Sequence, residues 1–332
     1  MAGSPAVLWS RSLHMAAAAT TLAAAGDVLV VAERWSRLAG LDPAGGAVRW
    51  ERRIEDCWGV TVVAGDRVLH LTQAGVLRCL ELATGRPLWM VEDLSFGHYV
   101  SVAGPVVVTG GWRGYRPLTR LALADGAPLG GFDWEPAAPA WPLPLPGGRV
   151  LVAGADDPVL RLLDAGSGAQ LGRWRLPAPM LFPDAGVAFR TADDGRVVFL
   201  VGDRTVAAFS PAAGVEVLWE HGRPLPHPPV LSGGVLWLAE PDRVTVVDRG
   251  RPTEVTGLPQ GVAAATVPVP GGALVPRAGG NLVLLDPAGV VRGRVRVPAR
   301  VERVAGAGPL VHAIGKGHLT AVDVSPGDPS AG

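Results

Sequence analysis

Two histidines of this chain stand close in sequence to carboxylates, a pairing that can carry general acid–base chemistry. His98 follows Glu92 and Asp93 within one short segment, and His221 directly follows Glu220. A histidine titrates near neutral pH, and a neighbouring carboxylate can orient its ring and stabilise the protonated form. If either pair faced a pocket, it could serve a lyase, a cyclase or an isomerase acting on a small molecule.

Other reactive side chains are sparse and lack the spacing of known sites. The histidine pairs His221/His227 and His312/His318 match no metal-ligand pattern, so no metal site is predicted. No nucleophile elbow or phosphate-binding glycine loop precedes a helix. Cys57 and Cys79, the only two cysteines, are expected to be free thiols, which fits a reducing compartment.

Aromatic and basic side chains gather instead in irregular stretches that we expect to be loops. This set consists of Trp58, Tyr99, Trp112, Arg113, Tyr115, Trp134, Trp141 and His227. Amphipathic rings on loops held by a rigid scaffold are typical of recognition surfaces, although each ring could equally fill a gap between packed units. We expect these residues to bind a small molecule, a peptide or a protein, with Trp112 and Tyr115 covering the ligand.

A repeated unit positions these loops, and its clearest copy is Leu77–Trp89, LRCLELATGRPLW. It reads as a strand, a tight turn that needs glycine, and a second strand closed by a large aromatic. The same turn recurs about every 40 residues, a period typical of propeller blades. The turn glycines are Gly46, Gly85, Gly126, Gly168, Gly214, Gly250, Gly289 and Gly327. The sequence therefore predicts an all-β fold, an eight-bladed β-propeller, because a β-sandwich would not repeat in this way.

The two ends of the chain complement each other. The last unit stops just after its turn, whereas Val7–Leu13 matches the strand that follows the turn in the other units. We expect this N-terminal strand to be the outermost strand of the last blade, which closes the ring. Residues 1–332 then form one domain, with repeats from about 7 to 324 and a flexible tail at 325–332. Met1–Ala25 could alternatively be a signal peptide of a secreted protein, but its removal would leave the last blade short, so we expect a cytoplasmic chain.

Strand direction separates the connections into two faces. With strands A to D from inside to outside, the connections after A and C are short, and those after B and D emerge together on the opposite face. For the second unit the predicted strands are Gly59–Ala64, Arg67–Thr72, Leu77–Leu82 and Pro87–Val91. The loops with the aromatic set belong to units two to five on this opposite face, where we place the binding site. The repeat tryptophans are predicted to pack between blades: Trp9, Trp50, Trp89, Trp174 and Trp219.

Composition excludes several classes of function. The 30 basic and 30 acidic side chains cancel, and no basic stripe marks a nucleic-acid surface. No stretch is long and apolar enough to span a bilayer as a helix. The basic residues are almost all arginine, which indicates a GC-rich, bacterial genome. We expect a monomer that binds neither nucleic acid nor membranes.

The turn pattern, an apolar strand running into Leu-Asp/Glu-x-x-Thr/Ser-Gly-x-x-x-Trp, resembles the PQQ-like repeat of quinoprotein-type propellers. The family contains quinone-dependent dehydrogenases and non-catalytic scaffolds such as the lipoprotein of the outer-membrane barrel-assembly machinery. The dehydrogenases hold their cofactor against a vicinal disulfide and a calcium ion, but Cys57 and Cys79 are not adjacent and Asn281 is the sole asparagine. The resemblance therefore implies a non-dehydrogenase member without a cofactor, a binding or scaffold propeller. The acid–base enzyme is the alternative, and a PQQ-dependent oxidoreductase is the third reading.

Overall fold

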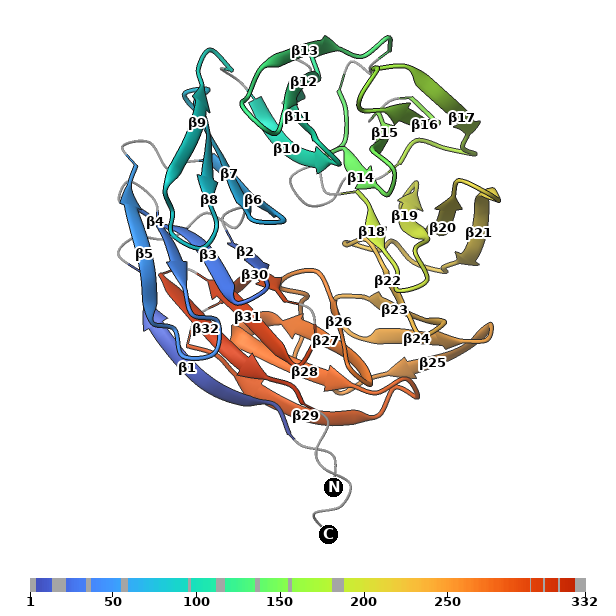
Figure 1. Cartoon of the computed structure of the whole chain (residues 1–332). Helices are drawn as coiled ribbons and strands as arrows, with labels where there is room; N and C mark the ends of the chain where they lie inside the picture. The colour runs from blue at the N-terminus through green and yellow to red at the C-terminus, as the bar shows by residue number, and fades with distance from the viewer. Residues whose placement is uncertain are drawn as a thin grey trace.

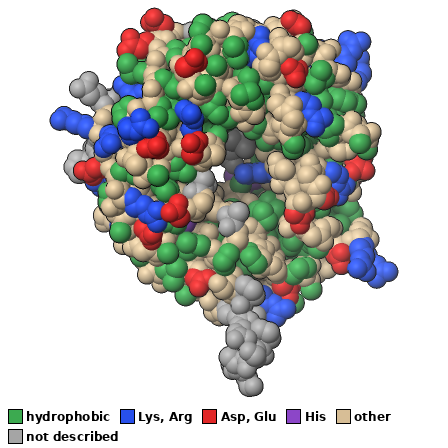
Figure 2. Space-filling view, in the orientation of Figure 1, with side chains coloured by type: hydrophobic (Ala, Val, Ile, Leu, Met, Phe, Trp, Pro, Cys, Tyr) green, Lys and Arg blue, Asp and Glu red, His purple; other side chains and the backbone are tan. Residues whose placement is uncertain are grey.

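The chain forms eight four-stranded antiparallel sheets arranged as the blades of a ring, as the repeat predicts (Figure 1). This computed structural model describes residues 4–13, 22–33, 37–54, 59–94, 97–111, 117–134, 138–154, 157–180, 188–298, 300–306, 308–315 and 317–325. A single 3₁₀ turn, η2 (Ala278–Gly280), interrupts the β-structure of these residues. A space-filling view shows an opening at the centre of the ring (Figure 2).

The strands follow one another from the inside of each blade to the outside. Blade one consists of β2 (Leu22–Ala25), β3 (Val28–Glu33), β4 (Arg37–Leu41) and β5 (Val48–Arg53), and blade two of β6 (Gly59–Ala64), β7 (Arg67–Thr72), β8 (Leu77–Glu81) and β9 (Pro87–Val91). Blade three consists of β10 (Gly97–Ala103), β11 (Val106–Gly111), β12 (Thr119–Ala122) and β13 (Pro128–Gly131), and blade four of β14 (Leu143–Leu145), β15 (Arg149–Ala153), β16 (Val159–Asp164) and β17 (Gln170–Arg175). Blade five consists of β18 (Arg190–Thr191), β19 (Val197–Val201), β20 (Thr205–Ser210) and β21 (Gly214–Glu220), and blade six of β22 (Val230–Ser232), β23 (Val235–Ala239), β24 (Val244–Asp248) and β25 (Arg251–Val255). Blade seven consists of β26 (Val267–Val269), β27 (Gly272–Arg277), β28 (Asn281–Leu285) and β29 (Val291–Arg296).

Blade eight is completed by the N-terminal strand, which confirms the predicted closure. Its strands are β30 (Val301–Ala305), β31 (Leu310–Gly315), β32 (His318–Asp323) and β1 (Ala6–Ser12). β1 runs antiparallel to β32, with Ala6 opposite Asp323 and Ser12 opposite His318. The Leu13 N–H donates to the Gly317 carbonyl at 2.8 Å and extends this pairing. In Figure 1 the blue β1 lies along the outer side of the red blade eight.

The repeat tryptophans join successive blades, as predicted. The Trp50 indole N–H donates to the Leu82 carbonyl at 2.7 Å, one blade further along the chain. Gly85 in the same turn has φ of +66°, and a Cβ there would lie 2.5 Å from the Trp50 ring. Only glycine satisfies both conditions, because the left-handed backbone and the close ring each exclude a side chain. Trp9 and Trp89 lie in the same way against Gly46 and Gly126.

Blade three uses an arginine where its neighbours use tryptophan. The buried guanidinium of Arg120 donates to the Leu129 and Gly131 carbonyls of β13 and to the Ala165 and Gly166 carbonyls of blade four. Gly130, at the expected tryptophan position, leaves the space that this side chain needs. In blade four, Trp174 folds back over Gly172 and reaches Gly214 of blade five.

The core is divided among the eight interfaces between neighbouring blades. Each interface contains one cluster of buried aliphatic and aromatic side chains. The B strands contribute most, because both of their faces are covered; every residue of β3 and β27 is buried. Apolar surface is thus buried at every interface of the ring, which stabilises the contact between neighbouring blades.

Backbone hydrogen bonds identify the two predicted faces. The Leu82 N–H, in a turn after strand C, donates to the Asp66 carbonyl in the turn after strand A. The Leu94 N–H, in a connection after strand D, donates to the Gly75 carbonyl in the turn after strand B. We call the side with the A–B and C–D connections the turn face, and the side with the B–C and D–A connections the loop face.

Candidate binding face

The inner strands of seven blades surround a cavity of about 580 Å³. This volume lies within the range of pockets that hold small molecules. Its wall is mainly aliphatic, with Phe189 and Trp141, and its charged side chains are Arg190, Glu302 and Arg303. The register of β30 shifts between Val301 and Arg303, so that two successive charged residues line the same cavity.

Two of the predicted recognition aromatics meet at the start of the inner strands of blades three and four. The rings of Tyr99 and Trp141 are 5.6 Å apart between centroids, and the Trp141 indole N–H reaches the Val100 carbonyl at 3.1 Å and Ser101 Oγ at 3.0 Å. Tyr99 is buried, whereas Trp141 is half-buried and lines the cavity. Burial raises the pKa of the Tyr99 hydroxyl above its usual range. Trp141 thus presents an aromatic surface at the loop-face end of the channel.

Trp134 has a different setting: it lies in the connection after β13 and packs against Arg161 of β16, the C strand of blade four. The guanidinium carbon of Arg161 lies 3.6 Å from the Trp134 ring centroid, a cation–π contact. The same guanidinium donates to Gln170 Oε1 at 2.8 Å and lies 3.5 Å from Asp157. Trp134 remains half-buried, so that one side of its ring packs on arginine while part of the ring stays accessible.

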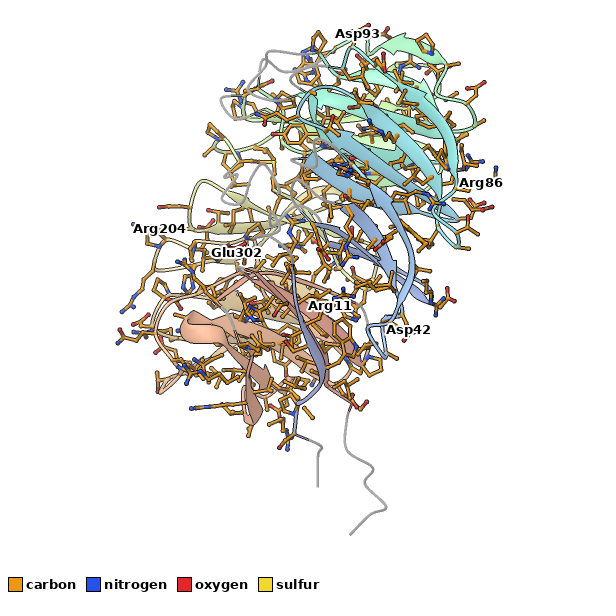
Figure 3. All side chains as sticks on the ribbon, turned by 90° about the vertical axis from the view of Figure 1, so that its left-hand side faces the viewer. Arg11, Asp42, Arg86, Asp93, Arg204 and Glu302 are labelled. Atoms are coloured by element: carbon orange, nitrogen blue, oxygen red, sulfur yellow. The ribbon has the colours of Figure 1, made fainter. Side chains whose placement is uncertain are left out.

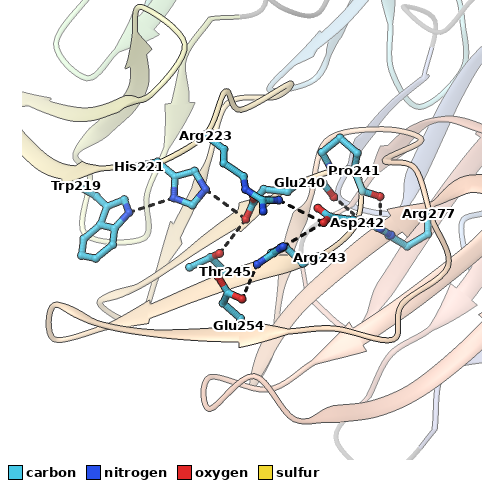
Figure 4. Close-up of polar contacts among 10 residues, drawn as sticks. All are labelled: Trp219, His221, Arg223, Glu240, Pro241, Asp242, Arg243, Thr245, Glu254 and Arg277. Atoms are coloured by element: carbon cyan, nitrogen blue, oxygen red, sulfur yellow. Dashed lines mark hydrogen bonds and ion pairs between the residues drawn. The ribbon is translucent and has the colours of Figure 1, made fainter.

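His221 lies beside a carboxylate, but the carboxylate belongs to the next blade (Figure 4). His221 Nε2 is 3.2 Å from Glu240 Oε1, and the side chain of Glu240 is 1% exposed. Thr245 Oγ1 donates to the same oxygen at 2.9 Å, and the Arg223 guanidinium lies 4.0 Å from the other one. The predicted pairing of His221 with Glu220 does not form, because Glu220 accepts from Thr205 Oγ1 instead.

Both ring nitrogens of His221 face protein groups. The Trp219 indole N–H lies 3.4 Å from Nδ1, and an indole can only donate, so Nδ1 accepts and Nε2 carries the proton. Nε2 lies 3.2 Å from Glu240 Oε1 without the alignment of a hydrogen bond, and this nitrogen is buried. The ring is nearly buried. His221 therefore lies between blades five and six, with Nδ1 paired to Trp219 and Nε2 buried away from a substrate.

Arg277 closes the same cluster from blade seven (Figure 4). Its guanidinium donates to the carbonyls of Glu240, Pro241 and Pro259 at 2.6 to 2.7 Å, and its side chain is fully buried. Burial lowers the pKa of Arg277 from its ordinary value. Sequence reasoning missed Arg277 and Arg120, because a carbonyl ligand leaves no signature in the side-chain pattern. It also missed Glu240, whose partner His221 comes from the preceding blade.

The other predicted site residues differ in how exposed they are and in whether the structure describes them. Glu92 and Asp93 are exposed on the loop face, and Asp93 has φ of +63°, which aspartate tolerates. His98 belongs to β10, but its side chain lies outside the described residues. His227 is half-buried in the connection between blades five and six. Trp58, Trp112, Arg113 and Tyr115 lie outside the described residues, as do Cys57 and the predicted tail from 326 onward.

A buried histidine next to the cavity leads us to expect a stability that depends on pH. His70 Nδ1 lies 2.9 Å from Oγ1 of Thr61, which lines the cavity. Burial, with a smaller contribution from the Arg78 charge, lowers the pKa of His70 from 6.5 to about 4. The imidazole is therefore neutral in the fold at a pH where the unfolded chain binds a proton.

We expect the protein to lose stability as the pH falls from about 6.5 to about 4, because the unfolded state binds the extra proton in this window. The contribution of His70 amounts to about 3 kcal/mol across it. Chemical denaturation at several pH values measures the slope, and a His70→Gln variant should show a shallower one. An equal slope in both proteins would contradict this assignment.

In the part of the chain that the structure describes, no three His, Cys, Asp or Glu side chains gather as metal ligands. No helix among these residues has the length and apolar character of a membrane span. Cys79 is a buried free cysteine, and burial raises the pKa of its thiol.

Comparison with known proteins identifies the class of the fold and then the family. Residues 2–111 and 117–328 match the family model described as outer membrane protein assembly factor BamB, which is built on PQQ-like repeats. The molecule is thus an eight-bladed PQQ-like propeller. Because the match covers nearly the whole sequence, the chain belongs to the BamB-like family. A search of curated protein sequences found no match.

Solved structures agree on the architecture. BamB from Moraxella catarrhalis is 18% identical over 97% of this chain and 98% of that one, with a TM-score of 0.75. A quinohemoprotein alcohol dehydrogenase from Comamonas testosteroni is 12% identical over 97% and 76%, with a TM-score of 0.69. The computationally designed Ika8 protein is 16% identical over 94% and 98%, with a TM-score of 0.68. Identities this low establish the fold and leave function to the site.

Proposed function

We propose that this chain is a non-catalytic scaffold that holds a partner protein or peptide on the loop face of blades two to five. The observation that carries the proposal is the aromatic pair of Tyr99 and Trp141 at the loop-face end of the channel. A ring held by a second ring and by hydrogen bonds loses little entropy on binding, which favours an anchoring role. Membership in a family described as a protein assembly factor favours a protein partner over a small molecule.

The geometry of His221 favours binding over acid–base catalysis. A general base needs a nitrogen within hydrogen-bond reach of the substrate. Trp219 and Glu240 occupy the two sides of the His221 ring, which acts as a bridge between blades. The fixed contacts around this ring support a structural role for this histidine–carboxylate pair.

We also propose that the N-terminal segment is retained and that the protein acts in the cytoplasm. β1 and β2 both lie within residues 1–25, so cleavage after Ala25 would remove one strand from blade eight and one from blade one. N-terminal sequencing of the protein from its own host, combined with cell fractionation, tests both points. A mature chain that starts near residue 26 would contradict them.

The proposed face can be mapped with a photo-reactive amino acid placed at Pro117 on the loop face and, as a control, at Asp66 on the turn face. Both positions are exposed, so they sample solvent equally well. We expect one partner to cross-link reproducibly from Pro117 in extracts of the native host and not from Asp66, and to be lost when Trp112→Ala and Tyr115→Ala are combined. Equal cross-linking from both faces would contradict the proposal.

A further inference from the structure

Each blade ends in an outer strand that pairs on one side only, within the described residues, and leaves its other edge open. An open edge can pair with another strand, and charged side chains are a common way to prevent this. Six outer strands carry such charges, with Arg11 in β1, Arg49, Glu51, Arg52 and Arg53 in β5, Arg173 and Arg175 in β17, Glu216 and Glu220 in β21, Arg251 and Glu254 in β25, and Arg292, Arg294 and Arg296 in β29. Only the neighbouring strands β9 and β13 carry none.

β9 is the better docking edge of the two. β13 is four residues long, includes two glycines, and gives two of its carbonyls to Arg120. β9 offers five residues, and its Met90 is 54% exposed at the rim. Trp89 points into the interface with blade three, where its indole N–H donates to the Leu123 carbonyl at 2.9 Å. The accessible edge of β9 is therefore neutral and apolar.

Opposite charges flank this neutral edge. Arg86 precedes the strand and its side chain is 62% exposed, with a contact of 3.4 Å to Glu81. Glu92 and Asp93 follow the strand and are both exposed. Figure 3 shows Arg86 and Asp93 apart, at different ends of the outer part of blade two. A strand with a cation at its start and anions at its end is complementary to itself when two copies run antiparallel.

We propose that β9 is a self-association edge, through which two copies of this chain pair antiparallel and join their second blades into one continuous sheet. A register centred on Trp89 places Arg86 of each copy opposite Glu92 of the other, with Asp93 next along the strand, and places Met90 opposite Leu88. Isologous contacts of this kind are the usual basis of two-fold dimers. A contact of five residues is small, so the dimer is weak and forms at high protein concentration. This inference is independent of the loop-face partner, and it differs from the monomer expected from the sequence alone.

Sedimentation velocity of the full chain, from about 10 µM to about 1 mM, tests the proposal. We expect a reversible monomer–dimer equilibrium in the wild type. Met90→Lys, which places a charge at the centre of the edge, should weaken it at least about tenfold. Leu171→Lys in β17 is the matched control, because Leu171 is 53% exposed on an outer strand that already carries charges, and it should leave the equilibrium unchanged.

Charge reversal tests the register. The Arg86→Glu variant, and the variant combining Glu92→Lys with Asp93→Asn, should each fail to self-associate, because like charges then meet at both ends. Mixing the two variants should restore a dimer, since opposite charges again face each other; asparagine is used because it tolerates the left-handed backbone of Asp93. Thermal melts verify that all variants fold. The proposal would be overturned if the wild type stays monomeric or if the mixture of variants does not associate. It would also be overturned if dimerisation survives Met90→Lys or is lost in Leu171→Lys. A monomeric wild type would mean that the β9 edge is left for a strand of another protein.

Discussion

Removal of residues 1–13 is expected to lower the melting temperature by more than about 10 °C, because it opens the ring at blade eight. The deletion removes all of β1 and exposes the edge of β32. It also removes the Trp9 indole, which donates to the Pro43 carbonyl at 3.1 Å, and Arg11, which donates to the Gly46 carbonyl at 3.2 Å. Loss of a packed tryptophan alone costs about 3 to 5 kcal/mol.

Differential scanning calorimetry of the truncated and full chains measures this effect. Leu8→Ala is the control within the same strand, because Leu8 is half exposed and its truncation should change the free energy of unfolding by less than about 0.5 kcal/mol. A truncated chain that melts like the full one would show that β1 does not close the ring.

Arg277→Ala is the substitution expected to cost most among single residues, about 3 to 5 kcal/mol in the free energy of unfolding. It leaves the buried carbonyl of Glu240 and the partly buried carbonyls of Pro241 and Pro259 without their donor, and it opens a cavity between blades six and seven. An unsatisfied buried polar group costs about 1 to 3 kcal/mol. The ion pairs above it, including Arg223 with Asp242, should lose their fixed geometry as the loop relaxes.

Urea denaturation of Arg277→Ala and Arg294→Ala compares a buried arginine with an exposed one. Arg294 also donates to a single carbonyl, that of Gly257 at 3.3 Å, so it serves as a matched surface control with an expected loss below about 1 kcal/mol. Equal losses in the two variants would mean that the Arg277 clamp does not hold blades six and seven together.

The blade architecture was predictable because it depends on local, repeated signals. The strands of blade two agree with the predicted ranges, except that β8 ends at Glu81 instead of Leu82. The turn glycines that the structure describes all adopt positive φ, from +66° to +84°. Such a turn recurs in each blade, so its sequence pattern repeats and can be aligned with itself.

The polar contacts between blades were not predictable in this way. Neighbouring residues of a strand point to opposite sides, so Glu220 and His221 could not form the pair that their adjacency suggested. The true partner of His221, Glu240, comes from the next blade. Arg120 likewise binds carbonyls 45 and 46 residues away, which any sequence can provide. Contacts to backbone groups across one repeat therefore require the structure.

Within the aromatic set, one contact follows from the repeated architecture and another does not. Trp141 and Tyr99 come together because they stand at the starts of adjacent inner strands, a juxtaposition that follows from the ring. The stacking of Trp134 on Arg161 depends on how one connection crosses blade four, and the sequence carried no signal for it.

The central claim, a partner held on the loop face of blades two to five, is tested most directly by combining Trp112→Ala with Tyr115→Ala and measuring affinity for the partner that cross-links at Pro117. Isothermal titration calorimetry should show a loss of about 2 kcal/mol or more in binding free energy, because anchoring aromatics carry most of the energy of an interface. The melting temperature should stay nearly unchanged, since the sequence predicts that these residues belong to a binding loop and not to the packing between blades. Unchanged affinity, or a global loss of folding, would contradict the claim and assign these aromatics to packing.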